Sequence, residues 1–160
     1  MKPFNLLLVL FFTTFHSFGQ QRSIKKYIDP TGTYRLAIKT TKKNKETYGY
    51  SGQIQVRKIN FEKILMTFEV NKGAPSYNSG SFVDTLAYIN NKVIFVDLEL
   101  DSTCKILFEF EKKGIKVKQE AADFNAGCGF GQAVTADGYY EKISNKIPIL
   151  REPLTGELLE

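Results

Sequence analysis

Hydrophobic and polar residues alternate with a period of two along most of the chain from Gly32 onward. The alternation comes in short runs separated by turn residues, a pattern that is typical of antiparallel strands with one buried face. No window of helical length has a clean apolar period of about 3.6 residues. The pattern predicts about eight strands, in the runs GTYRLAIK, SGQIQVRKI, KILMTFEV, SFVDTLAYI, KVIFVDLEL, CKILFEF, IKVKQ and GYYEKIS.

The connections between these runs predict how the strands pair. Asn90 and Asn91 join two runs, and because Asn tolerates the left-handed conformation of a tight turn, we expect those two strands to pair directly. The segments DPTGTYRL and TADGYYEK open and close the domain, and pairing their strands would remove two exposed edges. We therefore predict an all-β fold, an antiparallel barrel of about eight strands or a barrel-like sandwich. We also expect a filled interior, because the inward positions are bulky: Met66, Phe68, Ile106, Phe108 and Phe110.

The N-terminal stretch MKPFNLLLVLFFTTFHSFGQQ contains one Lys, an apolar run from Phe4 to Phe12 and then small or weakly polar residues. This order predicts a secretory signal peptide over residues 1–19, cleaved after Gly19. The apolar run is shorter than the roughly 20 residues that span a bilayer, so we expect no stable membrane insertion after cleavage. The protein is therefore expected to be secreted or periplasmic.

Cleavage would also remove His16, the one histidine of the chain. A protein without imidazole lacks Ser-His-Asp and Cys-His catalysis and HExxH zinc sites. We therefore expect a protein that is not an enzyme and that holds no metal or cofactor, although carboxylate, Lys or Tyr chemistry stays open. The remaining chain divides into a lead-in over residues 20–31, a β domain over 32–144 and an extended or partly disordered tail over 145–160.

The chain is mildly basic, with 22 Lys and Arg against 17 Asp and Glu and a formal net charge of +5. The densest cluster is KTTKKNKE, from Lys39 to Glu46, and its Thr and Asn residues indicate a solvated loop. No aromatic and basic signature of an RNA-binding module and no zinc-finger spacing accompanies the cluster. We expect no nucleic-acid partner.

The segment CGFGQAVTADGYY, from Cys128 to Tyr140, has three interpretations: a phosphate cradle, a reactive cysteine loop, or the closing edge of a disulfide-bonded β-barrel. No helix or GK[ST] follows its glycines, as a phosphate cradle would require. In an oxidising compartment, two cysteines favour one Cys104–Cys128 disulfide over free or catalytic thiols. The bridge would close a loop of about 25 residues and stabilise the fold by roughly 3 to 4 kcal/mol.

The glycines around Cys128 are expected to allow positive φ and close backbone approach beside the bridge. Upstream of it, Asp97, Glu99 and Asp101 alternate within the run that begins at Lys92. On a strand these three acids would point to one face, which indicates a polar outer surface or, alternatively, a weak calcium site.

Two loops have a composition suited to recognition. The first is NKGAPSYNSGS, residues 71–81, and the second is ADFNAGCGFGQ, residues 122–132. Loops on a rigid β scaffold concentrate binding residues, and Tyr flanked by Ser, Gly and Asn suits contacts to proteins or sugars. The alternative is that the aromatic residues only cap the barrel ends. The candidate binding residues are Tyr77, Asn78, Ser79, Ser81, Asn125, Phe130 and Gln132.

From Cys104 through CGFGQAVTADGYY the chain resembles small exported, mostly uncharacterised bacterial β-domains, in which a Cys opens a CxIxFxF strand and a CGFG turn precedes a DGxY strand. More weakly, it is similar to the periplasmic inhibitors of c-type lysozyme. That resemblance implies a compact eight-strand barrel with a disulfide and a loop that enters an enzyme cleft. The inhibitors carry an SGxxY motif, and here Ser79 and Gly80 are followed by Val83 at the Tyr position.

Together these features predict an exported, non-enzymatic binding module that recognises a protein or glycan through its loops and could act as an inhibitor. The alternatives are a lipocalin-like carrier of a small apolar ligand and a carboxylate-based hydrolase. The lining of the largest concavity should separate the three: acids would indicate the hydrolase, hydrocarbon the carrier, and little of either the binding module.

Overall fold

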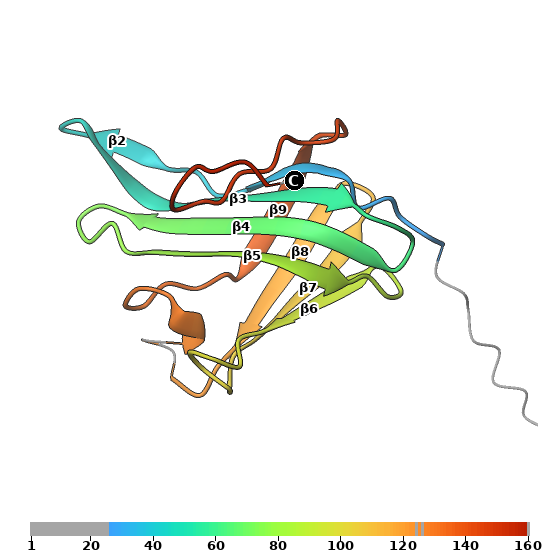
Figure 1. The fold of residues 1–160 in the computed structure, drawn as a ribbon. Helices are drawn as coiled ribbons and strands as arrows, with labels where there is room; N and C mark the ends of the chain where they lie inside the picture. Colours follow the sequence, from blue (N-terminus) through green and yellow to red (C-terminus); the bar gives the residue numbers. More distant parts are fainter. Residues whose placement is uncertain (1–25, 124, 126, 160) are drawn as a thin grey trace, which may run out of the picture.

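The computed structural model describes residues 26–123, 125 and 127–159, so the predicted signal peptide lies outside the described residues. Nine strands and one short 3₁₀ helix make up the described chain (Figure 1). The elements are β1 (Gly32–Leu36), β2 (Thr41–Lys43), β3 (Glu46–Lys58), β4 (Lys63–Gly73), β5 (Ser79–Ala87), β6 (Lys92–Val96), β7 (Lys105–Glu111), β8 (Gly114–Glu120), η1 (Gly127–Gly129) and β9 (Gly138–Ser144). The prediction of an all-β fold is confirmed. No helix within the described ranges is long and apolar enough to cross a membrane.

Eight strands form one antiparallel sheet in the order β5-β4-β3-β1-β9-β8-β7-β6, which curls into a nearly closed barrel (Figure 1). The predicted pairing of the first and last domain strands is confirmed, because β1 lies beside β9 with Arg35 opposite Glu141. The ninth strand, β2, pairs with the start of β3. The basic segment expected to be a loop is therefore a hairpin, with positive φ at Asn44 and Lys45 in its turn.

The prediction that the strands on either side of Asn90 and Asn91 pair directly is wrong. Both residues adopt positive φ, 53° and 62°, in the expected tight turn, and a single bridge joins Ile89 to Lys92. Beyond that bridge β5 and β6 are the two ends of the sheet. The rings of Phe82 and Phe95 stack between them with centroids 3.9 Å apart, so side chains rather than a backbone ladder occupy the seam.

The segment after β6 also differs from the prediction. The strand ends at Val96, and residues 98–100 form a turn. The carboxylate of Asp97 accepts hydrogen bonds from the backbone N–H groups of Glu99 and Leu100, at 3.0 and 2.8 Å. The three alternating acids are therefore not on one face of a strand, because Asp97 ends the strand by capping this turn.

The inward-facing positions fill the barrel with apolar side chains. The bulky residues predicted to face inward are all buried there. Phe68 is the centre of an aromatic cluster, with ring centroids 5.3 Å from Phe82, 6.0 Å from Phe108 and 5.9 Å from Phe130. Burying one such side chain stabilises the fold by about 1.5 to 3 kcal/mol, so this cluster is a main source of stability.

One end of the barrel is closed by the lead-in before β1. Asn91 is buried in the turn between β5 and β6, and its side-chain oxygen accepts a hydrogen bond from the N–H of Ile28 at 2.9 Å. Its amide nitrogen donates to the carbonyl of Lys26 at 2.8 Å, and the hydroxyl of Tyr88 donates to the carbonyl of Ile28 at 2.7 Å. A buried amide is costly unless it is hydrogen-bonded, so these contacts fix the lead-in to the barrel.

The opposite end is closed by the disulfide. The Cys104–Cys128 bond is confirmed, with Cα atoms 4.9 Å apart. Gly129 has the positive φ expected of a glycine beside the bridge, but Cys128 itself also has φ 64°. The N–H of Cys128 donates to the carboxylate of Asp101 at 3.0 Å. Hydrogen bonds from the Thr103 hydroxyl and from this N–H lower the pKa of Asp101, so the carboxylate that anchors the turn stays ionised.

The C-terminal segment packs on the outside of the barrel. Leu150 is fully buried, although it is not part of the barrel interior. The N–H of Leu159 donates to the carbonyl of Leu150 at 3.0 Å, and a bridge pairs Arg151 with Leu158. The guanidinium of Arg57, on β3, donates to the carbonyl of Leu159 at 3.3 Å. The tail is therefore folded back on itself over the sheet and is not simply extended (Figure 1).

Candidate binding groove

The two loops predicted to carry the site lie together at the disulfide end. The side-chain amide of Asn78 donates to the carbonyl of Gln132 at 2.9 Å, and the N–H of Gly131 donates to the carbonyl of Ser79 at 2.9 Å. Tyr77, in the loop between β4 and β5, is 47% exposed. The predicted residues at positions 77–79 and 132 thus form one continuous surface.

Two other predicted residues behave differently. Asn125 is exposed, and its carbonyl accepts the N–H of Ala133 at 2.9 Å, so it shapes the second loop. Phe130 is only 7% exposed, because its ring stacks on Phe68 inside the barrel end. The prediction that Phe130 projects from the loop is wrong, whereas the alternative that it caps the barrel describes its position. Phe124 lies outside the described residues.

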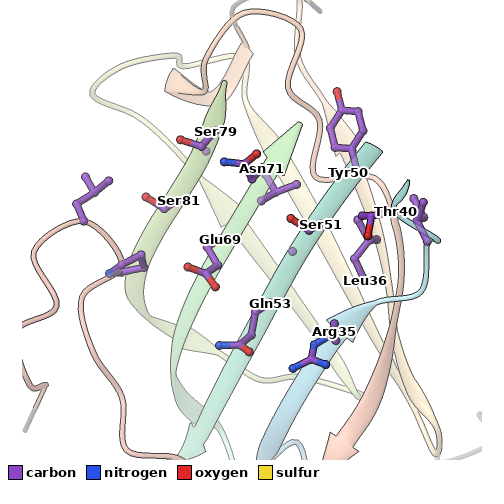
Figure 2. Close-up of a pocket in the computed structure, with 16 residues that line it drawn as sticks. Arg35, Leu36, Thr40, Tyr50, Ser51, Gln53, Glu69, Asn71, Ser79 and Ser81 are labelled. Carbon is purple, nitrogen blue, oxygen red and sulfur yellow. The ribbon is translucent and has the colours of Figure 1, made fainter. Parts of the chain in front are cut away.

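Ser79 and Ser81 line a concavity of ≈ 470 Å³, which we call the groove (Figure 2). Its floor is the outer face of β1, β3, β4 and β5, where every second residue points away from the barrel interior. The described residues that line it are Arg35, Leu36, Ile38, Thr40, Tyr50, Ser51, Gly52, Gln53, Glu69, Val70, Asn71, Ser79, Gly80, Ser81, Pro153 and Leu154.

Strand register aligns the polar floor residues in a row across the sheet. Arg35 lies opposite Gln53, Gln53 opposite Glu69, and Glu69 opposite Ser81. We call these four residues the polar row, and Figure 2 shows their side chains on one face of adjacent strands. None of the four side chains has a hydrogen bond or ion pair with another described residue. Their donors and acceptors therefore face solvent and are available to a ligand.

A second, shorter row lies beside the first, toward the disulfide end. Ser51 is opposite Asn71, and Asn71 is opposite Ser79. The side-chain oxygen of Asn71 accepts the N–H of Gly73 at 2.7 Å, which leaves its amide N–H donors for the groove. The groove floor is thus hydroxyl and amide groups, with one guanidinium and one carboxylate.

The walls of the groove come from outside the sheet. Ile38 and Thr40 form one side in the segment before β2, and Pro153 and Leu154 of the tail also line the groove. Leu154 is 81% exposed. The hydroxyl of Tyr50 donates to the carbonyl of Ala133 at 2.6 Å, and burial raises the pKa of Tyr50, so the donor stays protonated. This bond holds the ring at the end of the groove beside the second loop.

The groove lining contains few side chains of the kinds that catalyse reactions or hold a cofactor. Glu69 is the one carboxylate among the groove residues that the structure describes, whereas glycoside hydrolysis commonly uses two carboxyl groups. A second concavity of ≈ 300 Å³ includes Gln119 and Asp137. Both are engaged in the chain itself, since the Asp137 carboxylate accepts the N–H of Gln119 at 2.6 Å and the Gln119 side chain accepts the N–H of Ala136 at 2.7 Å.

Sequence reasoning missed Arg35, Gln53 and Glu69. Each occupies an outward position of an alternating run, where a polar residue is the ordinary choice for a solvated face. Only the order of the strands and their register bring the three together, because the residues are contributed by β1, β3 and β4.

Comparison of the chain with protein-family models, curated proteins and solved structures returned no match. The resemblance to exported β-domains and to periplasmic lysozyme inhibitors therefore stays a prediction.

Proposed function

We propose that this protein is an exported, non-enzymatic binding module that recognises a protein or a glycan through the groove and the β4–β5 loop beside it. The observation that carries the proposal is the polar row, in which Arg35, Gln53 and Glu69 face solvent without a partner among the described residues. The backbone of paired strands is fixed before binding, so a ligand has to order only the exposed side chains and not the chain that carries them.

Export is part of the proposal and rests on two independent features. The N-terminal residues have the composition of a signal peptide. The Cys104–Cys128 disulfide is of the kind that persists in oxidising compartments such as the periplasm or the extracellular space. N-terminal sequencing of the exported protein should begin at or near Gln20, and a retained Met1 would contradict this part of the proposal.

The two alternative functions have less support. A lipocalin-like carrier needs space inside the barrel, and the rings of Phe68, Phe82 and Phe130 stack there. A carboxylate-based hydrolase needs two carboxyl groups roughly 5 to 9 Å apart, and the described groove lining offers Glu69 alone.

Affinity capture with groove variants tests the proposal. The exported protein would be immobilised and exposed to exported proteins and cell-wall fragments, with captured material identified by mass spectrometry. We expect the wild type to capture a specific partner and the variant Arg35→Ala/Gln53→Ala/Glu69→Ala to lose it. The matched control is Lys105→Ala/Glu120→Ala, which removes a charged pair on the opposite half of the barrel and should retain capture.

Three results would overturn the proposal. Equal capture by the wild type and the groove variant would place recognition elsewhere. Release of a tightly held apolar molecule on unfolding would favour a carrier. Turnover of a cell-wall fragment that disappears with Glu69→Gln would show an enzyme.

A further inference from the structure

We infer that the groove binds an uncharged oligosaccharide. This inference rests on the proposed binding function and names the ligand class.

The charges of the lining balance. Arg35 supplies one positive charge and Glu69 one negative charge, and the other floor residues are neutral amides and hydroxyls. An anionic or cationic ligand would gain attraction from one of the two and repulsion from the other. A neutral ligand with many hydrogen-bonding groups avoids this conflict, and a saccharide has such groups on every ring.

The polar row offers both partners that a hydroxyl group needs. Arg35 can only donate hydrogen bonds and ionised Glu69 can only accept them, whereas Gln53 does both. A sugar hydroxyl donates one hydrogen bond and accepts others, so alternating donors and acceptors match adjacent hydroxyls. Because the side chains have no partners among the described residues, saccharide hydrogen bonds would replace only bonds to water.

The size of the groove fits a short chain of sugar rings. Its volume of ≈ 470 Å³ lies within the roughly 300 to 1,000 Å³ of small-molecule sites. The polar row crosses four strands, and at about 4.8 Å between neighbouring strands it spans about 14 Å. That length exceeds a single pyranose ring, so we expect an oligosaccharide. The apolar side chains of Ile38 and Leu154 beside the polar floor would contact the C–H faces of the rings.

A peptide fits this floor less well. Extended peptides commonly add to the free edge of a sheet, where backbone N–H and C=O groups are unpaired. The floor is instead the outer face of β1, β3, β4 and β5, and its three strands β1, β3 and β4 are each already paired on both sides. Recognition must therefore come from side chains, which suits a ligand whose own polar groups point outward along its length.

Titration with defined oligosaccharides tests the inference. The exported, disulfide-bonded protein would be titrated by calorimetry with neutral cello-, malto- and N-acetylated chito-oligosaccharides, and with sulfated and uronic-acid oligosaccharides for comparison. We expect binding to a neutral member of the panel, with an affinity that does not change with ionic strength. The Gln53→Ala variant should bind about tenfold more weakly, because it loses the hydrogen bonds of the Gln53 side chain to the saccharide.

The matched control is Gln55→Ala, on the outward face of the same strand but not in the groove lining. It should bind as the wild type does. Glu69→Gln is a second variant, because it removes the charge at nearly constant volume, and it should also weaken binding. Thermal unfolding of each variant checks that the barrel is intact.

The outcomes separate this inference from the proposed function. Binding confined to acidic oligosaccharides, with an affinity that falls at high salt, would overturn the uncharged ligand. Capture of an exported protein through the groove, with no saccharide binding, would overturn the inference and leave the proposed function standing. A partner whose affinity is unchanged by Gln53→Ala and by Glu69→Gln would overturn the inference and the proposed function together.

Discussion

On β6 and β7, Lys92 and Lys105 face outward directly opposite acids, whereas in the groove a whole strand separates the guanidinium from the carboxylate. Lys92 is opposite Glu109 and Lys105 is opposite Glu120. Both pairs form ion pairs, with the charged atoms of the second 3.9 Å apart. These two lysines are therefore paired within the sheet, whereas Lys118 on β8 lies opposite Leu107 and pairs with Asp137 just before β9.

The groove half is built from the same kind of strands, but its charged residues are placed differently across them. Gln53 lies between Arg35 and Glu69, so the backbones that carry the two charges are two strand spacings, or about 10 Å, apart. No ion pair joins the guanidinium to the carboxylate, and the Gln53 side chain has no hydrogen bond to either. Arg35 also lies opposite Glu141 on β9 and forms no ion pair with it, so the comparison shows that an acid on the neighbouring strand does not by itself pair an outward-facing cation.

Removing the core that both halves share should have the largest effect. Phe68 on β4 contacts Phe82 on β5 and Phe108 on β7, so Phe68→Ala leaves a cavity under both halves. We expect a loss of about 3 to 5 kcal/mol in the free energy of unfolding, measured by urea denaturation. Phe68→Leu is the conservative control and should cost less. A loss below about 1 kcal/mol for Phe68→Ala would mean that the cluster relaxes to fill the cavity.

Removing the disulfide should weaken the barrel end without altering the polar row. Cys104→Ser/Cys128→Ser releases a crosslink between residues 24 apart, which should cost about 3 kcal/mol of stability. We expect a lower melting temperature, equal to that of the reduced wild type, while ligand binding to the groove is retained below the transition. Loss of binding at full folding would show that the groove depends on the disulfide loop as well as on strand register.

A pair of double-mutant cycles should reveal the smallest but most direct difference between the halves. The coupling between Lys105 and Glu120 is expected to be about 0.2 to 1 kcal/mol, since both side chains are exposed. The coupling between Arg35 and Glu69 should be near zero at moderate salt, because the two are separated by a strand. Chemical denaturation of each single and double Ala variant gives both values. Equal couplings would remove the distinction on which the groove proposal depends.

The local pattern was sufficient to predict eight of the nine strands, the closure of the first strand on the last and the disulfide, but it missed β2 and carried β6 past Val96. Alternation identifies each buried face, and Cys104 and Cys128 have one way to pair within the chain. The seam between β5 and β6 was not predictable in this way. A tight turn at Asn90 is compatible with a hairpin and also with strands that separate after one bridge, and the choice depends on the packing of Phe82 against Phe95.

The candidate site was predicted only in part, for a related reason. The β4–β5 loop was recognised by its composition, and Ser79 and Ser81 do line the groove. Phe130 was predicted to be a binding residue because it stands in a loop on a rigid β scaffold, yet its ring stacks on Phe68 inside the barrel end, as the capping alternative had it. The sequence around Arg35 and Glu69 carries no local signal, because only the register of β1, β3 and β4 brings the two residues to the same groove.

Gly80 links the groove to the barrel interior in a way that should constrain how this sequence evolves. A Cβ atom at position 80 would lie 2.3 Å from Cγ of Phe130, so the ring occupies the space of a side chain that Gly80 lacks. Its neighbours Ser79 and Ser81 face the groove on the other side of the strand. The wall between the groove and the core is thus one backbone thick. Diverging descendants of this chain should therefore change positions 80 and 130 together, because a side chain at position 80 needs the space that the ring now fills.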